Sequence, residues 1–410
     1  MGQYKKQLTY IDIVLATVGY TIGAGIFAVL GIASKYGKEY TWLSIAICGF
    51  LAICTGLSFS ELASMFKKNG GEYYFVKEAI NDEIAKLTAG TLLIIEILAI
   101  TSIAYALSGY LSEYVKIPSY ILSTLVIILL GFINYTGIRN TLNYNNFITI
   151  IEVSALIVLS LVGLTKNTKS DMFDLTKIKT NQISSILLGT AIIYFAFVGF
   201  ELIIDLSEET INPETTVPNG MMSGLLIATV IYMLIGISAI SSIGWKKLSQ
   251  SSAPLAELAK HLLGKWGHKF VYIIALLSMS GSILMTHVGA SRFIQGVSNS
   301  VELPFGLNKI DSATNTPVNA IVFITILSIL GLGLGNLENS VIVTNIMTMV
   351  LFFLINLSAI ILRIKQPDRE RNFKIPGNIM NIPVPSIIGV VSSFILGILL
   401  MVKPNLFNKV

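Results

Sequence analysis

The sequence predicts an all-α polytopic membrane protein with about eleven transmembrane helices. Only 12% of its 410 residues are charged and 53% are hydrophobic, whereas about a quarter of the residues in a soluble domain are charged. The hydrophobic residues fall in blocks of roughly 20, which is the length of helix that crosses a hydrocarbon core of about 30 Å. Short polar segments separate the blocks, so we expect most of the chain to lie in the lipid bilayer.

Apolar windows predict the position of each span, and each span is expected to be helical because a helix satisfies its own backbone hydrogen bonds in lipid. The first run follows Lys5 and Lys6 but lacks a small-residue cleavage site, which favours a spanning helix over a signal peptide. A segment at 253–263 has apolar residues at helical spacing and is expected to lie flat on the membrane. The predicted spans are 11–33, 41–66, 84–112, 119–138, 144–165, 184–207, 218–243, 270–296, 318–335, 339–362 and 384–402.

The distribution of positive charge predicts the orientation of the chain. Lys and Arg together divide evenly between the two sides, so the positive-inside rule gives no preference when both are counted. Every arginine, however, falls on the side of the N-terminus: Arg139, Arg292, Arg363, Arg369 and Arg371. We therefore expect a multi-pass protein of the cell membrane with a cytoplasmic N-terminus. The odd number of spans then places the C-terminus outside.

Glycine interrupts the first and the sixth predicted spans at matching depths, at Gly23 and Gly25 in one and at Gly199 in the other. Each of these spans is the first of a group of five. A unit of five spans is odd, so a second copy inserts upside down, and such inverted repeats are common in secondary transporters. The expected organisation is a first repeat at 1–165, an external loop at 166–183, a second repeat at 184–363, and helix 11 with a tail at 364–410.

A broken helix in the middle of the membrane predicts a ligand site, because unwound backbone is tolerated there only where it lines a cavity or contacts a polar group. A new helix N-terminus exposes amides with a partial positive field, and a new C-terminus exposes carbonyls with a partial negative one. The amides of residues 24–26 suit a carboxylate. The carbonyls near Thr21, Phe195 and Val198 suit an ammonium group. The alternative is that the glycines of span 1 form a helix-packing face, which the matching break in span 6 argues against.

Residues around both breaks resemble signatures of the amino acid-polyamine-organocation (APC) superfamily. Residues 23–27 (GAGIF) resemble its GxGIF signature. Residues 195–201 (FAFVGFE), with the acidic run at 207–218, resemble its span 6 and the loop that follows. Further matches extend the resemblance in order over nearly the whole chain, at residues 60–62, 70–73, 289–292 and 373–377.

The resemblance implies a ten-helix core of two inverted five-helix repeats, which is the APC or LeuT-like fold, and transport by alternating access. It implies an amino-acid substrate held at both breaks, with Phe195 as an aromatic lid. Relatives often have twelve helices, whereas this sequence ends soon after the eleventh, and the missing helix lies outside the ten-helix core. The expected substrate-binding residues are Thr21, Ile22, Gly23, Ala24, Gly25, Ile26, Phe195, Val198, Gly199, Glu201 and Glu96.

Two acidic residues inside predicted spans are functional candidates, because ionisable groups at membrane depth are costly. Glu152 aligns with the span 5 position at which many proton-coupled relatives carry a lysine. It is expected to carry a coupling proton, to help hold a cation, or to be a protonated structural residue. Glu96 lies in a segment that resembles the cationic branch of the family, and either a contact with the substrate side chain or a structural role fits it.

Three further acidic residues are assigned to the breaks, to coupling or to gating, and one histidine is interpreted as structural. Glu201 follows the break in span 6, and we favour a hydrogen bond to the unwound turn over a substrate contact. Asp205, one turn later, is a coupling candidate nearer the cytoplasmic end. Glu61 is expected to act in gating, together with Phe195, through a network with basic residues, and a solvated salt-bridge cluster is the alternative. His287 is more typical of a packed, singly bonded histidine than of a proton relay.

These features predict a secondary active transporter of neutral or cationic amino acids, coupled to protons or working by exchange. The alternative is an amino-acid sensor without net flux, against which the lack of an appended soluble domain speaks. We expect neither an enzyme nor a cofactor, since no metal-spaced His/Glu cluster or Ser/His pair lies at a common depth. Cys48 and Cys54 point to different faces of one predicted helix, which excludes a disulfide between them and a zinc site. No run of basic and aromatic residues predicts nucleic-acid binding.

Overall fold

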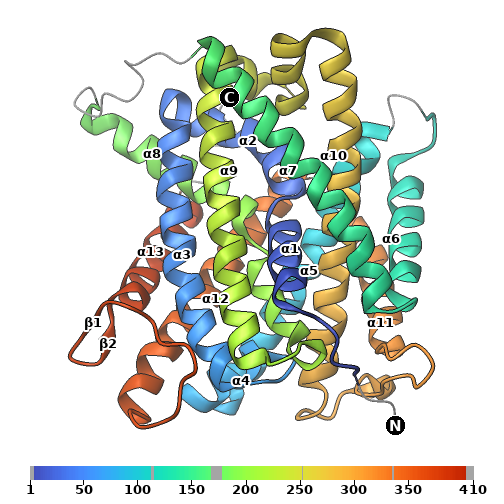
Figure 1. Cartoon of the computed structure of the whole chain (residues 1–410), viewed down its shortest axis with the longest axis vertical. Coiled ribbons are helices and arrows are strands. Elements are labelled where there is room, and N and C mark those ends of the chain that lie inside the picture. Colours follow the sequence, from blue (N-terminus) through green and yellow to red (C-terminus); the bar gives the residue numbers. More distant parts are fainter. Residues whose placement is uncertain (1–3, 112–114, 168–177, 252, 335–336, 403–410) are drawn as a thin grey trace.

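The chain forms a bundle of helices that run close to the long axis of the molecule (Figure 1). The computed structural model describes residues 4–111, 115–167, 178–251, 253–334 and 337–402. In this part of the chain, nine segments are long and apolar enough to cross a membrane, and Ser119–Tyr135 and Val318–Gly331 are shorter apolar helices. These segments correspond to the eleven predicted spans. The prediction of an all-α polytopic membrane protein is therefore confirmed.

The first part of the chain, up to the fifth span, holds a short helix that the sequence did not predict. This helix, α4, lies between the second and third spans. The helical segments are α1 (Tyr10–Thr21), α2 (Ala24–Gly37), η1 (Lys38–Tyr40), α3 (Thr41–Met65), α4 (Gly71–Ala79), α5 (Asp82–Leu111), α6 (Ser119–Tyr135) and α7 (Ile138–Asn167).

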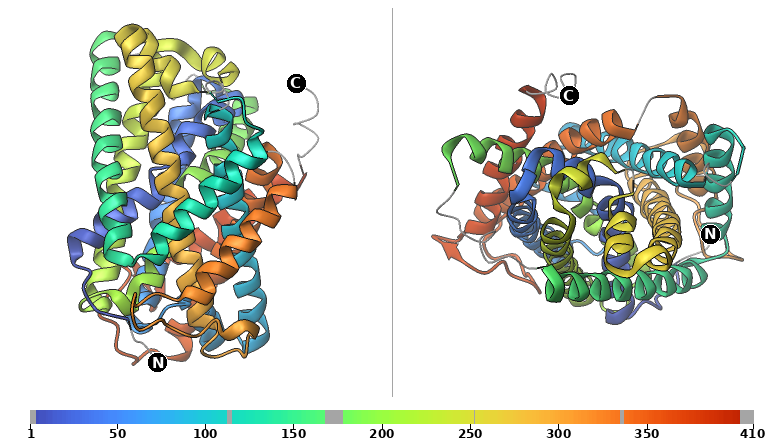
Figure 2. Two further views of the ribbon diagram at one scale, coloured as in Figure 1. Left: turned by 90° about the vertical axis from the view of Figure 1, so that its right-hand side faces the viewer. Right: turned by 90° about the horizontal axis from the view of Figure 1, so that it is seen from above.

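The second part of the chain holds the longest helices and a short hairpin before the last span. Helix α7 contacts α10, which runs over most of the height of the bundle (Figure 2). The segments are α8 (Thr180–Ile193), η4 (Tyr194–Phe197), η5 (Phe200–Glu209), α9 (Pro213–Gln250), α10 (Pro254–Val297), η6 (Pro304–Gly306), α11 (Val318–Gly331), η7 (Leu332–Leu334), α12 (Leu337–Lys365), β1 (Asn378–Ile379), β2 (Ile382–Pro383) and α13 (Val384–Val402).

Both predicted helix breaks are present. The first span is divided into α1 and α2, which lie one above the other in Figure 1. The sixth span continues from α8 through η4 and is interrupted at Val198 and Gly199 before η5 begins. Gly199 has a φ of +116°, a conformation that glycine adopts without the steric cost of a Cβ. The boundaries of the two repeats, at 1–165 and 184–363, stay a prediction.

Helix α9 holds the broken first span close to the centre of the bundle. It packs against α1, α2, α3 and α7. A Cβ added to Gly224 would lie 2.5 Å from the Thr17 Cβ, and one added to Gly220 would lie 2.5 Å from Ile13 Cγ2. Small residues allow this close approach of membrane helices. The centre of the bundle is therefore built around α1 and α9.

The segment at 253–263, expected to lie flat on the membrane, is helical, and its position relative to the membrane stays a prediction. This segment is the beginning of α10, which has a non-helical residue at Gly264. Its apolar residues Leu255, Leu258 and Leu262 are buried within the protein, and Pro254 lies over the glycine at position 31 of α2. The apolar face that suggested membrane contact is buried within the protein, in part against α2. The predicted external loop at 166–183 lies largely outside the described residues.

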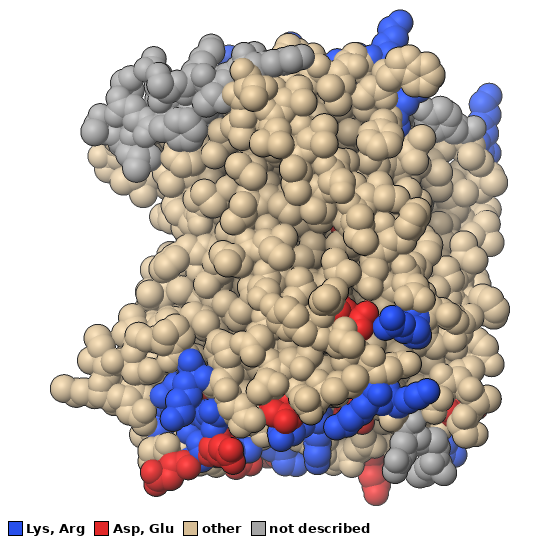
Figure 3. All heavy atoms as spheres, in the orientation of Figure 1, with Lys and Arg blue, Asp and Glu red and all other residues tan. Residues whose placement is uncertain are grey.

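Charged side chains gather toward one end of the bundle. In the view of Figure 3 they form a belt of both signs near the bottom, and the middle of the surface is almost entirely uncharged. We call this end the N-terminal face, since it holds residues 4–8, α4 and the end of α10. An uncharged band between charged or polar ends is the pattern expected of a protein that spans a bilayer.

Candidate substrate site

A small cavity lies where the two helix breaks meet. Its volume is about 40 Å³, which is enough for a small number of water molecules. The structure therefore shows a closed site. The cavity is lined by Tyr20, Thr21, Ala24, Gly25, Leu92, Ile95, Glu96, Ala99, Ile103, Phe195, Val198, Gly199, Glu201, Leu202, Ser282 and Thr286.

Most of the predicted substrate-binding residues lie in this lining, and three lie behind it. Ile22 and Ile26 are buried in the core. Gly23 faces α10, where an added Cβ would lie 1.7 Å from Ser282 Oγ. The predicted residues in the lining are Thr21, Ala24, Gly25, Phe195, Val198, Gly199, Glu201 and Glu96. Their contacts with a substrate stay predictions.

The amide end of the site is the beginning of α2. The N–H of Ala24 donates a hydrogen bond to Ser282 Oγ at 3.1 Å. An added Cβ on Gly25 would lie 2.5 Å from the Ala196 Cα, so the absence of a side chain brings α2 directly against η4. Ser282 could not be predicted from the sequence, because one serine in an apolar helix carries no local signal. In the closed state the Ala24 amide, which we assigned to a substrate carboxylate, is therefore already hydrogen-bonded to this hydroxyl.

The carbonyl end of the site is held by a tyrosine of α9. The Tyr232 hydroxyl lies 2.6 Å from the Thr21 carbonyl oxygen and 2.9 Å from that of Ala196. The Phe195 carbonyl accepts a hydrogen bond from the Val198 N–H at 3.3 Å. A carbonyl oxygen has two lone pairs, so Thr21 and Phe195 each keep one for a ligand. Tyr232 fixes the ends of α1 and η4 relative to each other, a role that was not predicted from the sequence.

Replacing Tyr232 by phenylalanine is expected to lower the free energy of unfolding by about 1 kcal/mol, the usual net contribution of a hydrogen bond. The ring packs edge-on against Phe197 at 5.1 Å and would remain in place. Thermal unfolding of the purified protein measures the effect, with Tyr120→Phe as the control because the Tyr120 side chain is half exposed. Equal stability of both variants would show that the hydroxyl does not hold the breaks together.

Two carboxyl groups in the lining have different surroundings. Glu201 Oε2 accepts a hydrogen bond from the Gly199 N–H at 2.9 Å, which is the contact with the unwound turn that we favoured. Glu96, from α5, is 2% exposed. Neither of its carboxyl oxygens has a hydrogen-bond partner among the described residues. A buried polar group without a partner is costly, so Glu96 is the group of the cavity that most needs a donor from a ligand.

Comparison with known proteins identifies the family. The family model described as amino acid permease matches residues 8–409. The chain belongs to the amino acid permease family. This match confirms the resemblance to APC transporters that the two breaks and their flanking motifs suggested.

Curated relatives of this permease are named as transporters of several amino acid classes. The branched-chain amino acid permease BcaP of Bacillus subtilis is 24% identical over 97% of this chain and 88% of its own length. The vacuolar cationic amino acid transporter 8 of Arabidopsis thaliana is 23% identical over 88% of this chain and 63% of its own. The human cystine/glutamate transporter is 27% identical over 91% and 77%. The relatives thus share amino acid transport but differ in substrate.

The two coupling candidates of the permease lie outside the cavity lining. Glu152 of α7 is 2% exposed, and its Oε2 has no hydrogen-bond partner in the described part of the chain. Ser278 of α10 and Tyr232 lie close enough to interact with it. Asp205 of η5 is fully buried, and its Oδ1 accepts a hydrogen bond from the Gly70 N–H at 2.7 Å. Their roles in coupling stay predictions.

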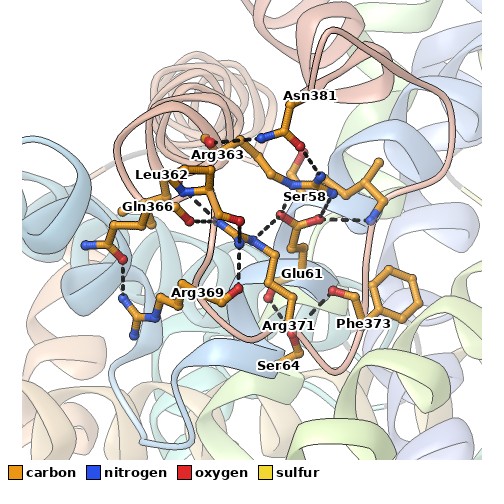
Figure 4. Close-up of polar contacts among 12 residues, drawn as sticks. Ser58, Glu61, Ser64, Leu362, Arg363, Gln366, Arg369, Arg371, Phe373 and Asn381 are labelled. Carbon is orange, nitrogen blue, oxygen red and sulfur yellow. Dashed lines mark hydrogen bonds and ion pairs between the residues drawn. The ribbon is translucent and has the colours of Figure 1, made fainter.

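Glu61, the predicted gating residue, forms a buried ion-pair cluster at the N-terminal face (Figure 4). Arg363 of α12 donates from Nε and Nη2 to both carboxylate oxygens, at 2.5 and 2.6 Å. Arg371 donates from Nε at 3.1 Å, and the N–H of Ile375 donates at 2.9 Å. All three charged side chains are less than 10% exposed. The alternative of a solvated cluster is therefore wrong, because α3 is joined to α12 and the following loop in the interior.

His287 makes two side-chain contacts, whereas the prediction from the sequence was a singly bonded histidine. Its Nδ1 lies 3.0 Å from Asn134 Nδ2, and its Nε2 lies 2.9 Å from Thr325 Oγ1. Asn134 also accepts a hydrogen bond from Arg292 Nη1 at 3.1 Å. These contacts join α10 to α6 and α11. His287 is therefore packed in a structural network.

Proposed function

We propose that this permease is a secondary active transporter that moves amino acids across the cell membrane by alternating access, with its N-terminus in the cytoplasm. The observation that supports the proposal is the meeting of an amide end and two carbonyl ends at one closed cavity. An amino acid carries a carboxylate and an ammonium group, and these backbone ends present complementary partial charges. The names of the curated relatives support the same class of substrate.

In this proposal the substrate carboxylate binds the amides of Ala24 and Gly25, and Ser282 moves aside or donates to the carboxylate. The ammonium group binds the carbonyl oxygens of Thr21, Phe195 and Val198, and Phe195 covers the substrate as a lid. Helices 1, 2, 6 and 7 of the predicted numbering rock against the others, and Glu61 takes part in gating. Transport is coupled to protons or proceeds by exchange, with Glu152 and Asp205 as the candidates for coupling.

Counterflow in proteoliposomes tests this function. Liposomes loaded with an unlabelled amino acid are expected to accumulate the labelled form transiently, with leucine, arginine and glutamate as the first panel. An imposed pH gradient then separates proton coupling from exchange. Saturable binding of an amino acid, without counterflow of any amino acid, would contradict transport and favour a sensor.

Glu96 is expected to discriminate between cationic and apolar substrate side chains. If a cationic side chain supplies the missing donors, Glu96→Gln raises the KM for arginine roughly tenfold or more, since hydrogen bonds to charged groups contribute about 1.5–3 kcal/mol. The KM for leucine is expected to change little, because an apolar side chain makes no such bond. The concentration dependence of labelled uptake measures both values. Equal changes for arginine and leucine would assign Glu96 a structural role instead.

A further inference from the structure

Two buried carboxyl groups lie between the substrate cavity and the N-terminal face. Asp205 lies in η5, one turn after Glu201, and Glu72 lies in the first turn of α4. Both side chains are fully buried. The start of α4 is fixed against η5 at this level, since the Gly70 N–H donates to Asp205 Oδ1 at 2.7 Å and an added Cβ on Gly71 would lie 2.4 Å from an Ile204 methyl group. The two carboxyl groups therefore lie close enough to interact, where α4 packs against η5.

Three of the four oxygens of this pair lack a partner. Glu72 Oε1, Glu72 Oε2 and Asp205 Oδ2 have no hydrogen-bond partner among the described residues. Burial and the neighbouring Asp205 carboxyl raise the pKa of Glu72. Two carboxylates that lie close enough to interact and are shielded from water do not both stay ionised. In the closed structure the pair is therefore expected to hold a proton.

The groups around the pair do not supply a compensating charge. Arg292 is the cation that faces it within the described residues, and Arg292 is already paired with Glu209, with Nε and Oε2 2.6 Å apart. No group of three or more His, Cys, Asp and Glu side chains in the described residues is arranged to hold a metal ion. The charged and titratable groups that face the pair are Glu201 and Glu208 of η5, Arg292 of α10, Glu96 of α5 and Tyr20 of α1.

Tyr20 connects the pair to the substrate cavity. Its side chain is 5% exposed, it lines the cavity, and its hydroxyl has no partner in the described part of the chain. It lies close enough to Asp205 and to Glu96 to interact with both. In this structure the hydroxyl donates a hydrogen bond to neither carboxyl group, so its interaction with both is electrostatic. Polar groups thus continue from Glu96 through Tyr20 to Asp205 and Glu72.

We propose that Glu72 and Asp205 form a proton-binding site that holds one shared proton while the pathway is closed and releases it to water when α4 and η5 separate. The inference rests on the proposed transport function, and it adds Glu72 to the coupling machinery. On release the pair changes from one negative charge to two, and repulsion between the carboxylates favours the open state. Reclosure requires that one proton is taken up again from the side of the N-terminal face.

The proton-binding site is tested by measuring counterflow while the pH on one side of the membrane is varied. The permease is reconstituted in a single orientation with leucine or arginine on both sides, and pH is changed only at the N-terminal face. Glu72→Gln and Asp205→Asn are each expected to move the midpoint of the pH profile down by roughly one unit, because the remaining carboxyl loses its like-charged neighbour. The double variant Glu72→Gln/Asp205→Asn is expected to lose the dependence of counterflow on pH at the N-terminal face. Glu78→Gln, an exposed residue on the same helix, is the control and should keep the original profile.

A double variant that keeps the original midpoint would overturn the proposal. If the double variant does not transport, infrared titration of the purified protein decides, because it detects protonated carboxyl groups without requiring flux. The unaltered permease is expected to show one more protonated carboxyl near neutral pH than Glu72→Gln/Asp205→Asn, and equal numbers would refute the site. Absence of counterflow for every amino acid in the unaltered protein would refute the transport function instead, and the infrared comparison would still decide the proton site.

Discussion

Replacing Glu61 by glutamine is expected to destabilise the permease by about 3–5 kcal/mol, which is the cost of removing one partner from a buried ion pair. The change leaves Arg363 and Arg371 buried without a carboxylate. It also replaces one of the two acceptor oxygens by an NH2 group, so that the Ile375 N–H and the two arginines are left with one acceptor oxygen. Because these contacts join α3, α12 and the loop before β1, we expect the cluster to loosen as a unit.

Thermal unfolding in detergent measures this loss, and Glu78→Gln is the matched control. Glu78 also lies near an arginine, since Arg369 Nη1 is 3.7 Å from its Oε1, but both side chains are partly exposed. Surface ion pairs contribute about 0–1 kcal/mol, so the control should unfold close to the temperature of the original protein. A Glu61→Gln variant as stable as the control would contradict a structural role for the buried cluster.

Adding one methyl group at Gly25 is expected to reduce transport by roughly tenfold or more. The new Cβ of Gly25→Ala would lie 2.5 Å from the Ala196 Cα and 3.0 Å from its Cβ. Overpacking of this kind costs typically 1–3 kcal/mol, and here it pushes the amide end of the site away from the carbonyl end. The position of the substrate groups then no longer matches both helix breaks.

The control for this change is Gly90→Ala in α5, where an added Cβ meets no atom within 4 Å among the described residues. Initial rates of counterflow and melting temperatures are compared for both variants. Gly90→Ala is expected to match the original protein in both measurements. A Gly25→Ala variant with an unaltered rate would contradict the close contact of α2 with η4 as a requirement for transport.

The sequence predicted the spans and the two breaks because both have local signals. A spanning helix needs about 20 apolar residues in succession, and each break carries glycine in such a run. Helix α4 has no such signal, since it is short and mixes charged with apolar residues. Its position depends on contacts with distant residues, as the hydrogen bond from Gly70 to Asp205 illustrates.

The roles of the buried acids could not be predicted because burial is common to all of them. Their partners distinguish them, and those come from other elements of the fold. Glu61 has two arginines, Glu201 has the Gly199 amide, and Glu96 and Glu72 have no partner among the described residues. Single polar residues such as Tyr232 were missed for the same reason. Only the packing of the helices shows which backbone groups they reach.

The central claim is that the two helix breaks hold the amino acid. A high-resolution structure of the permease with bound arginine or leucine tests it most directly. We expect the substrate carboxylate within hydrogen-bond distance of the Ala24 and Gly25 amides, and the ammonium group at the carbonyls of Thr21, Phe195 and Val198. A substrate bound elsewhere, with both breaks unoccupied, would contradict the account.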